Sequence, residues 1–163
     1  MLKLKIEDLG NGRDELILNI ELTPNFSRTS DSYYLFDFLE IADDEIENQK
    51  LNYNSTLTYG AIKLLEYWTE RIKSIKKNEV KFIPFDLWDE YIGGLLIEHT
   101  DLGYKIKLAS TDQINGFGIN KSTIDAQLEK IELDSSKNKN LEWLVSKSDI
   151  LEGLERNRYE LTE

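Results

Sequence analysis

The sequence predicts an α+β protein with a mainly antiparallel sheet, one long helix packed on a face of it, and shorter C-terminal helices. Segments that alternate apolar and polar residues occur in both halves of the chain, which is typical of half-exposed antiparallel strands. Between them, residues 57–77 repeat apolar residues at steps of three and four, which is typical of a helix with one buried face. The length of 163 residues suits one domain, residues 1–163, and no repeat or linker divides it.

The first part of the chain predicts a β-hairpin. Apolar side chains alternate with charged or polar ones over residues 2–6 and 16–22, and Gly10-Asn11-Gly12 between them suits a turn. We interpret residues 24–30 as a polar connection. The aromatic-rich residues 33–41 are expected to form a third strand.

The long helix is predicted over residues 57–77. Ser55 or Thr56 can cap its start, and basic residues gather at its end, where the helix dipole favours positive charge. We expect Trp68 to be a packing residue rather than a ligand platform. The apolar stripe consists of Leu57, Ala61, Leu64, Leu65, Trp68, Ile72 and Ile75.

The second half predicts further strands. Residues 80–87 alternate but contain Pro84, which indicates an edge strand or a bulge. Residues 91–98 and 104–108 read as strands around a turn at 100–103. Residues 114–119 are expected to add a short strand.

Helical signals return near the C-terminus. Ser122-x-x-Asp125 has the spacing of a capping box that opens a helix. Residues 141–145 fit either a short strand or the start of helical structure. Ser146-x-x-Asp149 opens the last helix, and we expect the tail after Arg156 to fray.

Charge restricts the classes of partner. Lys plus Arg is 20 and Asp plus Glu is 31, a formal charge of −11, which disfavours nucleic acid and anionic membranes. Two windows, residues 29–49 and 82–104, contain acidic residues and no Lys or Arg. The acidity serves either solubility alone or a basic protein partner. No apolar run approaches a membrane span and the start lacks a secretory signal, so we expect a cytoplasmic protein.

Several chemistries lack the residues they need. There is no cysteine, which excludes disulfides and cysteine-ligated zinc, and the single histidine, His99, leaves little material for a catalytic triad. Gly93-Gly94 and Gly116-x-Gly118 lack phosphate-loop spacing and indicate a bulge, a bend or close packing. We therefore expect no enzyme activity, no catalytic residue, no cofactor and no metal.

The residues 82–97, residues 114–119 and the helix that follows Ser122 resemble immunity proteins of bacterial polymorphic toxin and contact-dependent growth inhibition systems. The resemblance implies a cytoplasmic protein that binds a cognate toxin nuclease domain and blocks its active site or substrate surface. Such nucleases tend to be basic, so an acidic inhibitor would associate quickly. Two alternatives stay open: a non-catalytic interaction module of an unrelated assembly, and a small carboxylate-dependent enzyme.

The acid-only windows supply the candidate partner-binding residues. The acids at residues 43–47, in the first window, are expected in a loop. Those at residues 86–90, in the second window, surround two aromatic anchors, Trp88 and Tyr91. The alternative is that Trp88 belongs to the core and the acids solvate a turn, and a carboxylate pair or hard-cation site is the less favoured reading. The candidates are Asp43, Asp44, Glu45, Glu47, Asp86, Trp88, Asp89, Glu90 and Tyr91.

Overall fold

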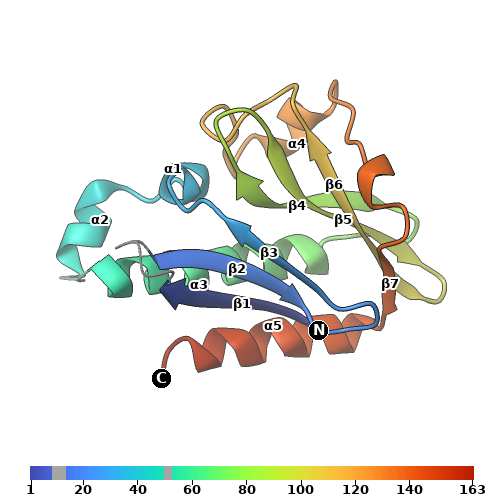
Figure 1. Ribbon diagram of the computed structural model, residues 1–163, viewed down its shortest axis with the longest axis horizontal. Coiled ribbons are helices and arrows are strands. Elements are labelled where there is room, and N and C mark those ends of the chain that lie inside the picture. The colour runs from blue at the N-terminus through green and yellow to red at the C-terminus, as the bar shows by residue number, and fades with distance from the viewer. Residues whose placement is uncertain (9–13, 50–52) are drawn as a thin grey trace.

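The computed structural model describes residues 1–8, 14–49 and 53–163 and confirms the α+β class (Figure 1). Its strands form two antiparallel sheets instead of the one expected. The three-stranded sheet has the order β1 (Leu2–Asp8), β2 (Asp14–Ile20), β3 (Phe26–Ser30). The four-stranded sheet has the order β4 (Val80–Leu87), β5 (Ile92–Thr100), β6 (Gly103–Thr111), β7 (Glu142–Val145).

Two long helices pack beside the sheets. α3 contacts β1 and β2 of the first sheet and β4 of the second, while α5 contacts β1 and α3 (Figure 1). Buried side chains from both sheets and both helices form one continuous cluster. None of the helices formed by the described residues has the length and apolar character of a bilayer-spanning segment. The helices are α1 (Leu35–Leu39), α2 (Asp43–Asn48), α3 (Tyr53–Lys73), α4 (Ile124–Leu128) and α5 (Lys147–Glu160), with a 3₁₀ turn at Ser136–Asn138.

The apolar stripe of α3 lies in the core as predicted. Trp68, Leu65 and Ile72 are fully buried, and the other stripe residues are nearly so. The helix spans Tyr53–Lys73, so it begins before Ser55 and Thr56 and ends before residue 77. The expected cap positions therefore lie inside its first turns.

The N-terminal hairpin is confirmed, but the third strand is not where the sequence indicated. β1 and β2 pair from Leu2↔Ile20 to Asp8↔Asp14, while the Gly10–Gly12 turn falls outside the described residues. β3 forms from the polar segment Phe26–Ser30, which pairs with β2. Its side chains are mostly exposed, so backbone pairing rather than an apolar face makes it a strand.

Within residues 33–41, Leu35–Leu39 form helix α1 instead of the expected strand. Leu35, Phe38 and Leu39 have a spacing of three and four, and all three are buried on one helical face. Their aromatic content suggested a strand, but this helical period decided the structure. The chain leaves the helix through Glu40, whose backbone is left-handed with φ of 55°.

β4 is an edge strand with a bulge, as Pro84 predicted. Pairing with β5 shifts between Pro84 and Asp86. At the bulge the strands approach so closely that a Cβ on Gly94 would lie 2.1 Å from the Ile83 carbonyl oxygen. Gly94 therefore permits close packing of the two strands, which is one of the roles predicted for the Gly93-Gly94 pair.

Two expectations for residues 114–125 are wrong. Residues 114–119 form turns, held by a hydrogen bond from Gly116 N to the Trp88 carbonyl of 2.7 Å, and not a strand. The expected helix does begin here, as α4, but its N-cap is Thr123, whose side chain makes no capping bond, so the predicted capping box is wrong. Ser122 binds Glu40 instead, and Asp125 forms an ion pair with Arg71.

The last strand and helix agree with the sequence at their starts. Residues 142–145 are a strand, and the Ser146 side chain accepts a 3.0 Å bond from Asp149 N at the start of α5. The tail is helical to Glu160, contrary to the expected fraying. The buried Asn157 binds both backbone groups of Leu4, which fixes this part of the helix to β1.

We predict that Leu65→Ala lowers the free energy of unfolding by about 2–5 kcal/mol, because the smaller side chain leaves a cavity in the core. Urea denaturation measures this loss. Leu102→Ala is the matched control, because Leu102 is 82% exposed in the β5–β6 turn, and we expect a change below about 0.5 kcal/mol. Similar losses in both variants would contradict the buried position of the stripe.

Candidate functional site

The turn between β4 and β5 carries the candidate site. Trp88 N donates to the Tyr91 carbonyl at 3.0 Å, which closes the turn, and Gly116 N donates to the Trp88 carbonyl. A Cβ on Gly116 would lie 2.7 Å from the backbone of Leu87, so only glycine permits this approach. The turn is thereby fastened to residues 114–119.

Five aromatic side chains gather there, and we call them the aromatic surface: Tyr33, Tyr34, Trp88, Tyr91 and Phe117. Ring centroids are 4.9 Å apart for Tyr33 and Tyr34, 6.2 Å for Tyr34 and Phe117, and 6.3 Å for the stacked Trp88 and Tyr91. Tyr33 is 75% exposed, Phe117 66% and Trp88 36%. Trp88 is therefore not a core residue.

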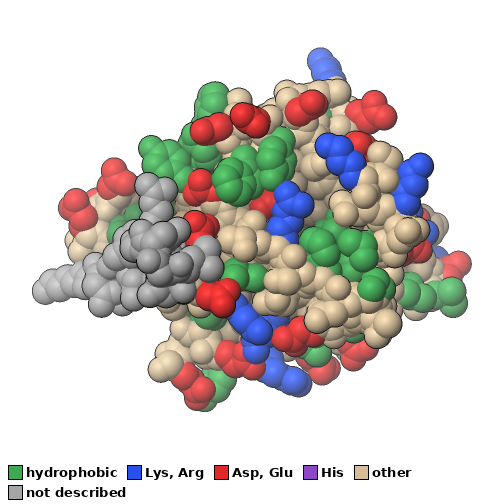
Figure 2. All heavy atoms as spheres, in the orientation of Figure 1, with side chains coloured by type: hydrophobic (Ala, Val, Ile, Leu, Met, Phe, Trp, Pro, Cys, Tyr) green, Lys and Arg blue, Asp and Glu red, His purple; other side chains and the backbone are tan. Residues whose placement is uncertain are grey.

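Acidic side chains border the aromatic surface. The Asp89 carboxylate accepts the Tyr34 hydroxyl, and this hydrogen bond raises the pKa of Tyr34 to about 12. Glu90 is exposed beside it, and the Asp31 carboxylate accepts Tyr33 N at 2.8 Å. Figure 2 shows exposed apolar side chains with acidic ones among and beside them on this face. Residues 31–34, near the start of the acid-only window 29–49, therefore lie beside the β4–β5 turn, which belongs to the window 82–104.

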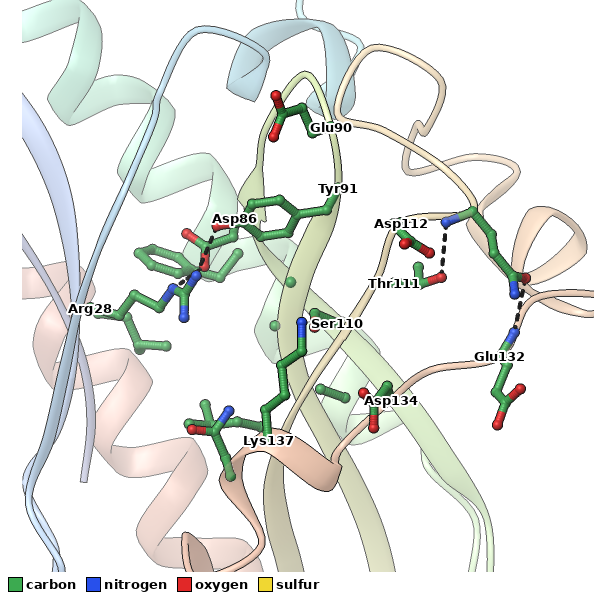
Figure 3. Close-up of a pocket in the computed structure, with 18 of the residues that line it drawn as sticks. Arg28, Asp86, Glu90, Tyr91, Ser110, Thr111, Asp112, Glu132, Asp134 and Lys137 are labelled. Carbon is green, nitrogen blue, oxygen red and sulfur yellow. Dashed lines mark hydrogen bonds and ion pairs between the residues drawn. The ribbon is translucent and has the colours of Figure 1, made fainter.

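Asp86 lies inside the protein and not on this border. Its side chain is 3% exposed and forms an ion pair with Arg28, which also donates to the Tyr91 hydroxyl at 2.8 Å (Figure 3). Burial raises the pKa of Asp86, and the Arg28 charge opposes that shift. The structure therefore places Asp86 as a buried partner of Arg28, whereas Asp89 and Glu90 are exposed.

The other candidate acids belong to a separate place. Asp43, Asp44, Glu45 and Glu47 are exposed on helix α2, not in the loop that we expected. Three acids in its first turn interact favourably with the positive end of the helix dipole, which stabilises a helix in this polar segment. α2 lies beyond α1 at one end of the molecule, and Glu45 accepts the Tyr59 hydroxyl there (Figure 1).

Metal ligands do not cluster in the described part of the chain, and His99 lies against an aromatic ring. No group of three His, Cys, Asp or Glu side chains within residues 1–8, 14–49 and 53–163 is arranged to hold a metal ion. His99 packs on Tyr104, with ring centroids 4.8 Å apart, and its Nδ1 lies 3.4 Å from the Ile75 carbonyl oxygen. The expectation of a protein without enzyme activity stays a prediction.

Sequence reasoning missed three members of the aromatic surface: Tyr33, Tyr34 and Phe117. The interpretation of residues 33–41 as a strand gave no reason to expect the two tyrosines on one exposed surface. A helix starting at Leu35 instead leaves them before its first turn. Phe117 had no sequence signal of its own, because its exposure depends on the turn that Gly116 makes against Leu87.

The arrangement is suited to binding a protein. Exposed tryptophan and tyrosine side chains provide much of the binding energy in protein interfaces, and surrounding charges select the partner. No protein family, curated protein or solved structure matches the chain.

We predict that Asp86→Asn changes how stability depends on pH. The pKa of Asp86 is raised above its usual 3.8, so the folded protein holds this proton more tightly than the unfolded chain. Its contribution to stability is full below the unfolded pKa and is lost as pH rises through the folded pKa. The wild type should therefore lose stability relative to Asp86→Asn as pH rises above about 4 and passes through the raised pKa of the folded protein.

Urea unfolding of both proteins across this range measures the difference. The opposite effect of Asp125, whose pKa Arg71 lowers, is present in both proteins and cancels. A difference that stays constant with pH, or that favours the wild type as pH rises, would contradict the effect of burial on Asp86.

Proposed function

We propose that the protein is an immunity-type inhibitor that binds a basic bacterial toxin domain, such as a nuclease, through the aromatic surface and its acidic border. The observation that carries the proposal is the set of exposed aromatic rings beside Asp89 and Glu90 on a protein with a formal charge of −11. The residues 82–97 and 114–119, which carry the resemblance to immunity proteins, supply three of the five rings.

The aromatic rings would provide the affinity. Trp88 stacks on Tyr91, and Tyr34 is held by both its bond to Asp89 and its contact with Phe117. Rings held in place before binding lose little side-chain entropy in a complex, which favours tight association. Their partial exposure leaves them free to enter pockets on a partner.

The acids would provide speed and selectivity. Among the described residues, no ion pair involves Asp89 or Glu90, so their charge is available to a basic partner. The exposed acids of α2 add to the negative field at a greater distance. A cytoplasmic location is part of the proposal, because the inhibitor must meet a toxin that attacks nucleic acid inside the cell.

The test is the binding of the purified protein to the product of the adjacent upstream gene, measured as association and dissociation rates. Trp88→Ala should raise the dissociation rate by about thirtyfold, equivalent to about 2 kcal/mol, because it removes a central ring. Asp89→Asn with Glu90→Gln should slow association by about threefold to tenfold and flatten its salt dependence between about 50 mM and about 300 mM salt. Asparagine at residue 89 can still accept the Tyr34 hydroxyl.

Two further pairs locate the interface. Asp43→Asn with Asp44→Asn should slow association less than the change at residues 89 and 90. Glu152→Gln with Glu155→Gln on α5 is the control, because it makes the same change of charge outside the aromatic surface. Equal effects of all three pairs would move the interface elsewhere, and absence of binding by the folded wild type would contradict the proposal.

A further inference from the structure

A cavity of about 740 Å³ lies between the two sheets, on the side where β3 meets the second sheet (Figure 3). Arg28 and Asp86 form one wall, and residues of β5 and β6, among them Gly93, Leu108 and Ala109, line the space beside it. The opposite wall is the segment around Asp134, which is fixed to β6 by two backbone bonds with Ser110 of 2.8 and 3.0 Å. The size is that of a small-molecule site or of a groove for a partner's side chains.

The charge of the lining is negative. Five carboxylates, Asp86, Glu90, Asp112, Glu132 and Asp134, share the lining with two cationic side chains, Arg28 and Lys137. Asp86 already pairs with Arg28. Within the described residues, Glu90, Asp112 and Glu132 have no ion pair. Lys137 therefore faces an excess of acid.

A buried acceptor adds to this excess. Asp86 is 2% exposed, and its Oδ1 has no hydrogen-bond partner among the described residues. An unpaired buried oxygen is costly, and a donor brought by a ligand would relieve that cost. Acceptors without donors thus occur both deep in the wall and at the rim.

Arg28 shows how this wall receives a guanidinium group. Its Nε pairs with Asp86 and its Nη2 donates to the Tyr91 hydroxyl at 2.8 Å, while the apolar Phe26 and Phe85 belong to the same lining. In Figure 3, Lys137 likewise extends into the space between Arg28 and Asp134. Carboxylates beside apolar side chains complement a cation carried on an alkyl chain.

We propose that this cavity binds an organic cation, a guanidinium or ammonium group on an alkyl chain, supplied either as a free polyamine or as a basic side chain of a bound protein. The inference is separate from the proposed function, because the cavity shares only Tyr91 and Glu90 with the aromatic surface and its acidic border. Lys137 extends into the same space and would compete with the bound cation.

The test is an NMR titration that follows the backbone amides of Gly93 and Ser110 and needs no toxin. The probes are Nα-acetylarginine amide for a side chain, spermidine for a free polyamine, and the neutral Nα-acetylcitrulline amide as the control. We expect the cations to shift these amides with saturation and the citrulline compound to leave them unchanged. Tighter binding of the arginine compound would identify a protein side chain as the source, and tighter binding of spermidine a free polyamine.

Two matched pairs of variants separate the cavity from the general acidity of the protein. Lys137→Gln should strengthen cation binding by about threefold, because it removes a competing charge, while Lys139→Gln, two residues away and outside the lining, should not. Asp112→Asn should weaken binding by about threefold, and Glu155→Gln on α5 should not. Equal effects within either pair, or equal binding of the citrulline compound, would overturn the proposal.

Discussion

Three carbonyl groups along β4 accept hydrogen bonds from side chains instead of from a neighbouring strand. Trp68 Nε1 donates to Pro84, Arg71 Nε to Phe82 and Ser30 Oγ to Phe85, at 2.9, 2.7 and 2.9 Å. Donors from α3 and β3 thus satisfy an edge that would otherwise be open to another chain. These bonds join the long helix and both sheets, and the turn with Trp88 begins where this edge ends.

The edge of the first sheet is closed in the same way. Asn157 of α5 accepts from Leu4 N at 2.6 Å and donates to the Leu4 carbonyl at 2.9 Å, replacing a strand that β1 lacks. Because α3 and α5 also pack on each other, the two closures hold the sheets in one core. The proposed binding surfaces lie where the two sheets meet: Arg28 of β3 reaches Asp86 of β4 and Tyr91 of the turn.

Local patterns predicted the elements whose burial follows a regular period. The stripe around Leu65 predicted α3, and Pro84 predicted an edge strand with a bulge. The pattern misled for α1, where aromatic content suggested a strand although Leu35, Phe38 and Leu39 have helical spacing. Trp88, Asp89 and Glu90 became candidates because acidic and aromatic residues are adjacent in the sequence. Their meeting with Tyr34, and the pairing of Arg28 with Asp86, join residues more than fifty positions apart, which no local pattern encodes.

The most direct measurement of the edge closure compares Trp68→Phe with Trp143→Phe by urea unfolding. Both indoles donate to a proline carbonyl, Trp68 to Pro84 at 2.9 Å and Trp143 to Pro24 at 2.8 Å, and both substitutions remove the same atoms. The Pro84 bond is buried and the Pro24 bond only partly so. Trp68→Phe should therefore cost about 1–3 kcal/mol more, because it leaves a buried carbonyl without a donor. Equal losses, or a larger loss for Trp143→Phe, would contradict the dependence of the structure on the β4 edge.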